Sequence, residues 1–75
     1  MDTAQTVNCV GLACPMPIIK LSKAIKELAP GQRLEVVADD PAFAPDVRAW
    51  CNKTGNKLVS LDTDGGDIKA VIEKV

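Results

Sequence analysis

The stretch GLACPMPIIKLSKAIKEL, residues 11–28, decides the fold, because it marks where a helix begins and which of its faces is buried. Its first three residues predict a turn. Pro15 and Pro17 are tolerated in a first helical turn, where the backbone N–H groups have no acceptor within the helix. The helix is expected to run to about Leu28, because Pro30 disfavours helical geometry at the residue before it.

The pattern of this helix separates a core-facing stripe from apolar residues that lie outside it. At about 100° per residue, four apolar side chains share an arc of about 80°: Ile18, Leu21, Ile25 and Leu28. Met16 and Ile19 fall outside this arc, in the same turn as Cys14, and Lys20 and Lys23 share their sector. An exposed apolar pair bordered by lysines is typical of a docking patch. Two scattered surface residues beside a solvated lysine face give the same pattern, so both interpretations stay open.

Sequence patterns on both sides of this stretch predict four strands and a second helix. The strands are expected at residues 6–10, 33–38, 57–62 and 68–75. The acidic pair before Pro41, Asp39 and Asp40, is typical of a helix start, and this capping role is favoured over acid–base chemistry. The second helix is therefore expected to begin there or nearer Pro45, and to end at Gly55.

Apolar residues of the second helix and of the strands mark one shared core. In the helix an arc of about 60° holds Phe43, Val47, Trp50 and Thr54, with Cys51 at its edge. Along the strands apolar and polar residues alternate, so one face of the sheet is covered and the other is largely wet. We therefore expect an α+β fold, a two-layer α/β sandwich of order β-α-β-α-β-β, with two helices on one face of a four-stranded mixed sheet.

The composition is that of one small globular domain, residues 1–75. With 47% hydrophobic and 25% charged residues, the chain is neither disordered nor fibrous. Nine basic residues against ten acidic ones give a net charge of −1, and 3% of the residues are aromatic. Phosphate backbones attract basic stripes and bases stack on aromatic side chains, so direct nucleic-acid binding is not expected.

Further features bear on location and chemistry. No apolar run approaches the ~20 residues of a membrane span, and the polar N-terminus lacks the pattern of a signal peptide, so no membrane association is expected. Free thiols without an export signal indicate the cytoplasm. The chain has three cysteines and no histidine. No metal site of the usual zinc type and no cofactor is expected, which makes cysteine the main candidate for chemistry.

Cys14 is the cysteine best placed for nucleophilic chemistry, because it lies where the turn meets the helix. A helix start stabilises an anion, which predicts a thiol pKa modestly below ~8.5. Pro15 and Pro17 limit this effect, because they have no N–H to donate. A small cap residue would occupy the same place, and position alone favours neither interpretation. Cys9 and Cys51 are more simply interpreted as buried small hydrophobes.

The segment Gly11-Leu12-Ala13-Cys14-Pro15-Met16-Pro17 resembles the G-x-x-C-P-x-P signature of the TusA/SirA-like sulfur-carrier family. Later landmarks extend the resemblance over nearly the whole chain: Pro30-Gly31, Asp39-Asp40-Pro41, Asp46-Val47 before Trp50, and Gly55 before a strand. Asn8 departs from the family pattern, which often has aspartate three residues before the motif glycine, and this departure removes a charge.

The resemblance implies the same sandwich and a sulfurtransferase-like carrier that acts with partner enzymes. The implied acceptor of sulfane sulfur is Cys14, as a persulfide, with Gly11, Pro15 and Pro17 in positioning roles. The implied partners are a sulfur donor protein, of the cysteine desulfurase or rhodanese-like kind, and a sulfur acceptor protein. Such relays lead towards tRNA thiolation, cofactor sulfuration or sulfur oxidation.

Other functions remain as alternatives. A non-catalytic regulatory or interaction module would use the same fold with Cys14 as a cap only. An RNA-binding domain is less favoured, because the chain has no basic stripe. Loading of one sulfur atom onto Cys14 separates the carrier from the module.

Overall fold

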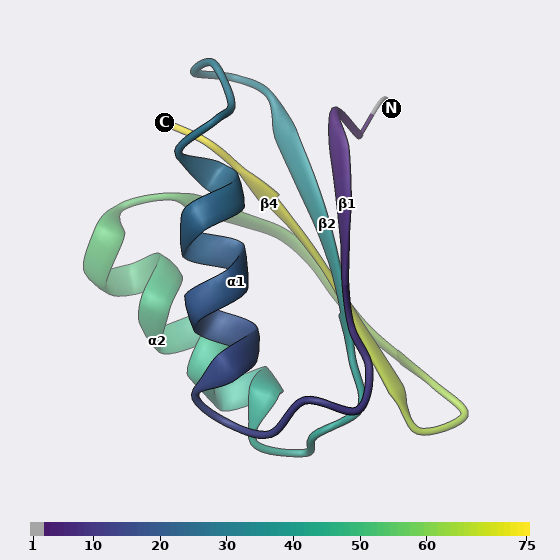
Figure 1. The fold of residues 1–75 in the computed structure, drawn as a ribbon. Helices are drawn as coiled ribbons and strands as arrows, with labels where there is room; N and C mark the ends of the chain where they lie inside the picture. The colour runs from purple at the N-terminus through teal and green to yellow at the C-terminus, as the bar shows by residue number, and fades with distance from the viewer. Residues whose placement is uncertain (1–2) are drawn as a thin grey trace.

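Four strands form one sheet in the computed structural model, which describes residues 3–75 (Figure 1). The strands are β1 (Gln5–Cys9), β2 (Arg33–Ala38), β3 (Lys57–Asp64) and β4 (Asp67–Glu73). Their order across the sheet is β1-β2-β4-β3. Because β1 is parallel to β2 while β4 is antiparallel to both of its neighbours, the sheet is mixed, as the sequence predicts.

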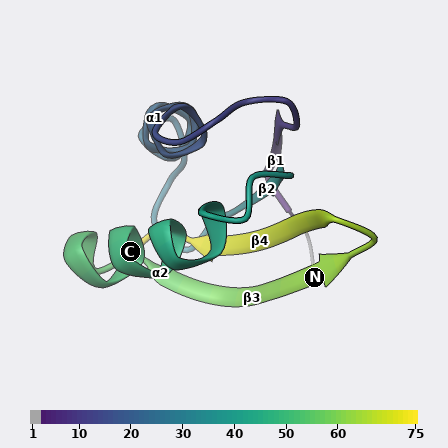
Figure 2. The ribbon, with the colours of Figure 1, turned by 90° about the horizontal axis from the view of Figure 1, so that it is seen from below.

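Two helices, α1 (Met16–Ile25) and α2 (Phe43–Thr54), lie on the same face of this sheet (Figure 2). The first packs on β1 and β2, and the second packs on β3 and β4. The element order β-α-β-α-β-β and the two-layer sandwich are thereby confirmed. Neither helix within residues 3–75 has the length and apolar character needed to cross a bilayer.

The core fills the space between the helices and the sheet. The alternating residues of β2 and β4 face it and are buried, as predicted: Leu34, Val36, Ala38, Ile68, Ala70 and Ile72. Phe43 and Val47 of α2 and Leu21 of α1 are also fully buried. Together these side chains form one core that packs both helices against the sheet, and Cys14 lies just before the amino-terminal end of α1.

The buried faces of the helices differ in detail from the wheel prediction. In α1, Pro17 is buried and Ile18 only half-buried. A proline can be buried here without leaving an unpaired N–H, because it has none. In α2, Cys51 belongs to the core, whereas the predicted stripe residue Thr54 is exposed and its hydroxyl donates to the Trp50 carbonyl at 2.8 Å.

The predicted element bounds are close but not identical to the observed ones. The first helix ends at Ile25 rather than Leu28, because its last turn tightens into short i→i+3 bonds. The Lys74 ammonium donates to the Leu28 carbonyl at 2.7 Å and so satisfies a group that the helix leaves free. β1 begins and ends one residue earlier than predicted, and β3 and β4 continue up to a tight turn at Gly65 and Gly66, both of positive φ.

The two ends of the described chain lie at the same end of the sandwich, where β1 and β2 begin and β4 ends. The Ala4 N–H donates to the Arg33 carbonyl at 2.8 Å, where β1 and β2 both begin. The Gly31 N–H donates to the Lys74 carbonyl at 2.7 Å, just after β4 ends. The opposite end of the sandwich therefore carries the turn after β1 and the loop after β2, and Cys14 lies at that end (Figure 1).

Candidate functional site at Cys14

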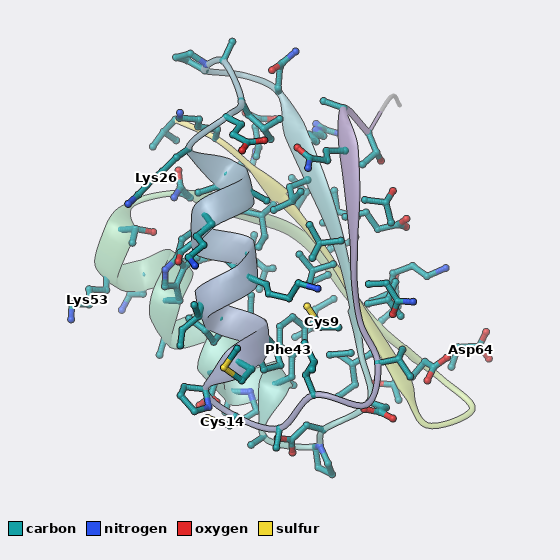
Figure 3. All side chains as sticks on the ribbon, in the orientation of Figure 1. Cys9, Cys14, Lys26, Phe43, Lys53 and Asp64 are labelled. Atoms are coloured by element: carbon teal, nitrogen blue, oxygen red, sulfur yellow. The ribbon has the colours of Figure 1, made fainter. Side chains whose placement is uncertain are left out.

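Cys14 lies in the turn between β1 and α1, at the foot of the helix, and its side chain is exposed (Figure 3). The turn is held by its own backbone, since the Leu12 N–H donates to the Cys9 carbonyl at 3.1 Å and the Met16 N–H to the Ala13 carbonyl at 2.9 Å. The Cys14–Pro15 peptide bond is cis. The sequence prediction that this cysteine lies where the turn meets the helix is confirmed.

The loop after β2 brings two carboxylates against this turn. Asp39 Oδ1 accepts the Gly11 N–H at 3.0 Å, and Asp40 Oδ2 accepts the Cys14 N–H at 2.8 Å. Asp40 Oδ1 also accepts the Ala42 N–H at 3.1 Å. The acidic pair therefore ties two loops together across the site.

This arrangement corrects the prediction that the acidic pair is a helix cap. The residue that caps α2 is Ala42, and no side chain caps this helix. Asp40 instead closes a turn in front of it, with its carbonyl accepting the Phe43 N–H at 2.9 Å. Side-chain bonds to the turn at Cys14 compete with capping, because each carboxylate oxygen is directed to one nearby N–H.

A third carboxylate, from α2, contacts the sulfur itself. Cys14 Sγ donates to Asp46 Oδ2 at 2.8 Å. Asp46 lies in the first turn of α2, and its backbone N–H donates to the Ala42 carbonyl at 3.1 Å, so the helix fixes its position. The thiol is thus held between two helices, with its proton directed at a carboxylate.

The electrostatics of the thiol are the reverse of those predicted from the helix start. The pKa of Cys14 is raised above the ordinary thiol value of 9.0. The main cause is the hydrogen bond to Asp46, which favours the protonated sulfur, followed by desolvation and by the negative charges of Asp46 and Asp40. The predicted modest depression of this pKa is therefore wrong, because nearby carboxylates outweigh the effect of the helix start.

Within residues 3–75 the carboxylates around the turn form no salt bridge. The salt bridge present in this part of the chain is Arg33–Glu73, at the end of the sheet away from Cys14. The hydrogen bonds from Cys14 and Ala42 to Asp40 lower the pKa of that carboxyl, which keeps it charged. The sulfur therefore lies in a negative environment that nothing in the described part of the chain neutralises.

The residues predicted to form a docking patch surround this site on one side. The side chains of Met16 and Ile19 are 45% and 39% exposed. Lys20 and Lys23 are exposed as well. An apolar pair with basic neighbours thus lies at the surface of α1, the helix that begins just after Cys14. We call Met16, Ile19, Lys20 and Lys23 the α1 patch.

The other cysteines are placed as the sequence predicts, inside the core. Cys9 and Cys51 are both buried, and all three cysteines are free. Burial raises the pKa of each buried thiol, so both are held as neutral groups. Neither of them can meet a partner protein at the surface.

Sequence reasoning did not find the role of Asp46, nor the contacts that Asp39 and Asp40 make with the turn. Asp46 is separated from Cys14 by 32 residues along the chain, and no local pattern connects them. A usable signal was the acidic composition of residues 39–46, which holds three aspartates near one predicted helix start. Only the packing of α2 beside α1 brings that charge to the thiol.

A shallow hollow of about 360 Å³ lies on the open face of the sheet, lined by Val37, Asp62, Asp64, Asp67 and Lys69. It is distinct from the site, because Val37 points away from the helices, between the buried Val36 and Ala38. Within residues 3–75 no group of three metal-ligating side chains comes close enough to hold a metal ion.

Comparison with known proteins connects this geometry to a family. Residues 5–74 match the sequence profile of the family described as sulfurtransferase TusA. A curated relative in Aquifex aeolicus (strain VF5), whose name describes a sulfur carrier protein, is 33% identical over 70 residues, or 93% of this chain. The chain spans 36% of the length of that relative.

A solved structure agrees with the sequence comparison. The crystal structure of a SirA-like protein from Desulfitobacterium hafniense superposes with a TM-score of 0.81 at 27% identity, covering 92% of this chain and 95% of the other. The resemblance first indicated by the cysteine–proline motif is thereby confirmed. From its fold and the match over residues 5–74, the chain belongs to the TusA sulfurtransferase family.

Proposed function

We propose that this protein is a sulfur carrier in which Cys14 accepts sulfane sulfur as a persulfide and passes it to a partner protein. The observation that carries the proposal is that Cys14 is the exposed cysteine of the three, in a segment that resembles the family signature. A sulfur atom that moves between two proteins must be reached by both of them, and a buried thiol cannot be.

The reaction is an exchange at sulfur without net oxidation. Cys14 loses its proton and Sγ attacks the terminal sulfur of a donor persulfide, so that a new S–S bond forms. The donor's S–S bond breaks, its electron pair stays on the donor sulfur, and that sulfur takes up a proton as a thiol. Delivery repeats the exchange, with an acceptor thiolate attacking the terminal sulfur and Cys14 leaving.

The motif residues support this role by fixing the sulfur at the surface. Gly11 has φ 87°, a backbone conformation that residues with a side chain rarely adopt. This conformation allows the chain to turn sharply out of β1. Pro17 is buried beneath the helix start, whereas Pro15 is exposed next to Cys14. A rigid turn on a buried anchor presents the thiol in one place and adds little loss of entropy on docking.

The partners we propose are a sulfur donor protein, a cysteine desulfurase or a rhodanese-like protein, and a sulfur acceptor protein. The α1 patch lies beside Cys14 and offers each of them apolar contact with basic neighbours. The acceptor determines whether the sulfur enters tRNA thiolation, cofactor sulfuration or sulfur oxidation. We place this exchange in the cytoplasm, where thiols stay reduced.

Mass measurement tests the proposal directly. After incubation with a cysteine desulfurase and L-cysteine, the protein is expected to gain ~32 Da, one sulfur atom, which a reductant removes. Cys14→Ser is expected to gain nothing, although it keeps Cys9 and Cys51. Because Cys14 is exposed and a serine hydroxyl can also donate to Asp46, the variant is expected to lose less than ~1 kcal/mol of stability. Loading of Cys14→Ser at the wild-type level would sink the proposed mechanism.

A further inference from the structure

The bond between Cys14 and Asp46 can exist only in one state of the sulfur. In the 2.8 Å contact Sγ is the donor and Oδ2 the acceptor, so the bond needs the proton of the thiol. A thiolate or a persulfide has no proton on Sγ. In either form the same contact brings sulfur lone pairs against a negative oxygen, and the attraction becomes repulsion.

The charged groups that face Cys14 all have the same sign. From α2 the group is Asp46, and from the loop after β2 it is Asp40, whose carboxylate accepts the Cys14 N–H. Asp39, in the same loop, accepts the N–H of Gly11. On α1, Lys20 acts electrostatically on Cys9, whereas the charges that act on the titration of Cys14 are both negative.

We propose that Asp46 is a positioning residue that keeps the Cys14 sulfur basic. The thiol then stays protonated in the empty carrier, and Cys14 is a slow leaving group in the loaded one. This inference rests on the proposed function, because it concerns the sulfur that Cys14 carries. It assigns to α2 a part in sulfur transfer that neither the cysteine motif nor α1 contains.

The basic sulfur has a consequence for each half of the exchange. An empty carrier attacks electrophiles as its thiolate, so a protonated thiol reacts slowly with small molecules near neutral pH. In the loaded carrier, a small thiolate can attack the terminal sulfur and expel Cys14. That step is slower when the leaving thiol is more basic, because the electron pair left on Sγ is less stable. Asp46 thus protects the sulfur from small thiols.

Productive transfer then needs a partner that offsets the carboxylate. A cationic side chain of the partner beside Asp46 stabilises Cys14 as the thiolate, because an opposite charge favours the ionised form. During loading the Cys14 proton leaves as Sγ attacks, and the departing donor sulfur takes up a proton. During delivery Cys14 leaves as the thiolate, takes up a proton and restores the bond to Asp46. Atoms and electrons balance without an added oxidant or reductant.

The first test measures the reactivity of Cys14 without any sulfur chemistry. The rate of alkylation by iodoacetamide, a neutral reagent, is followed against pH for the wild type, Asp46→Asn and Asp46→Glu. Asp64→Asn is the matched control, because it removes the same charge from an exposed position at the hairpin end of β3, on another element (Figure 3). Cys14→Ser gives the background of the buried cysteines.

Asp46→Asn is expected to reach half of its maximal rate at a lower pH than the wild type and the control. For each tenfold gain in thiolate fraction, intrinsic nucleophilicity falls by about threefold, so the net gain near neutral pH is about threefold. At high pH the order reverses, and the two profiles cross. Asp46→Glu keeps a negative charge and is expected to stay nearer the wild type. Identical profiles for Asp46→Asn and the wild type, with normal melting, would overturn the inference.

The second test measures retention of the carried sulfur. Loaded wild type and loaded Asp46→Asn are treated with dithiothreitol at one pH, and the released sulfide is timed. The variant is expected to release it faster, and equal rates contradict the proposed protection. If neither protein accepts sulfur from a donor, the proposed function is wrong, while the alkylation profiles still decide whether Asp46 controls the thiol.

Discussion

At the scale of single residues, the protonation of Cys14 makes a contribution to stability. Its raised pKa means that the folded protein holds the thiol proton more tightly than the unfolded chain does. This contribution is complete below the ordinary thiol value of 9.0 and is lost as the pH rises through the raised value of the folded protein. We therefore expect the melting temperature of the wild type to fall above pH 9.0 more steeply than that of Cys14→Ser.

Melting curves from pH 7 to pH 11 check this expectation. The serine variant is the proper reference, because its hydroxyl does not titrate in this range while the buried Cys9 and Cys51 are unchanged. Parallel slopes for the two proteins would show that the hydrogen bond to Asp46 has no influence on the thiol proton.

Cys51 is a buried cysteine whose contribution is to the stability of the core. It is 5% exposed in the core between α2 and the sheet. Cys51→Ala is expected to cost about 1 kcal/mol, as the loss of a small buried contact does. Sulfur loading of the folded variant is expected to equal that of the wild type. Loading that disappears while the melting curve stays sharp would place the chemistry at Cys51 instead.

At the scale of elements, α1 has one face in the core and another beside the sulfur. Burial of Met16 or Ile19 against a partner contributes about 1–3 kcal/mol each through apolar transfer. Ile19→Glu is expected to weaken sulfur transfer with at least one partner and to leave the melting temperature unchanged, because this side chain is 39% exposed. The assay is the transfer rate at several partner concentrations.

A matched variant separates the position of the patch from the added charge. Val75→Glu places the same charge at an exposed apolar residue near the opposite edge of the sandwich, where it is not expected to affect transfer. An unfolded Ile19→Glu protein would mean that this residue belongs to the core. A folded variant with normal transfer to donor and acceptor would mean that docking takes place on another surface.

The elements also show what could be predicted from the sequence. The bounds of β2 and the buried faces of β2 and β4 follow from local alternation, which depends on neighbouring residues alone. The bonds that define the site do not, because the pairs Gly11–Asp39 and Cys14–Asp46 are 28 and 32 residues apart. The helix start alone therefore predicts a lowered pKa for Cys14. The pKa is raised instead, mainly because the tertiary position of α2 brings Asp46 to the thiol.

At the scale of the whole molecule, charge is divided unevenly although the net charge is −1. The lysines of the α1 patch lie on the helix that follows a turn where three carboxylates gather, so a partner that covers both surfaces meets both signs. Reversal of Lys20 and Lys23 to glutamate is expected to slow transfer to an acidic partner at low salt. The effect is expected to fade above ~0.15 M salt, because screening then acts within about 8 Å.

Transfer rates against ionic strength check this expectation. The control reverses Lys26 and Lys53, two exposed lysines far along the helices from Cys14 (Figure 3), which changes the net charge equally. Equal slowing by the two double variants would indicate an effect of overall charge rather than of the α1 patch. Slowing that persists at high salt would indicate direct contacts rather than steering.

The first and last strands place both ends of the described chain away from the thiol. Backbone hydrogen bonds hold Ala4 and Lys74 at the end of the sandwich away from Cys14. A linker attached at either chain end therefore points away from the sulfur. A domain fused there, or an affinity tag bound to a sensor chip, leaves both the thiol and the α1 patch accessible. If a donor or an acceptor were fused through such a linker, the length of the linker would set its effective concentration at Cys14.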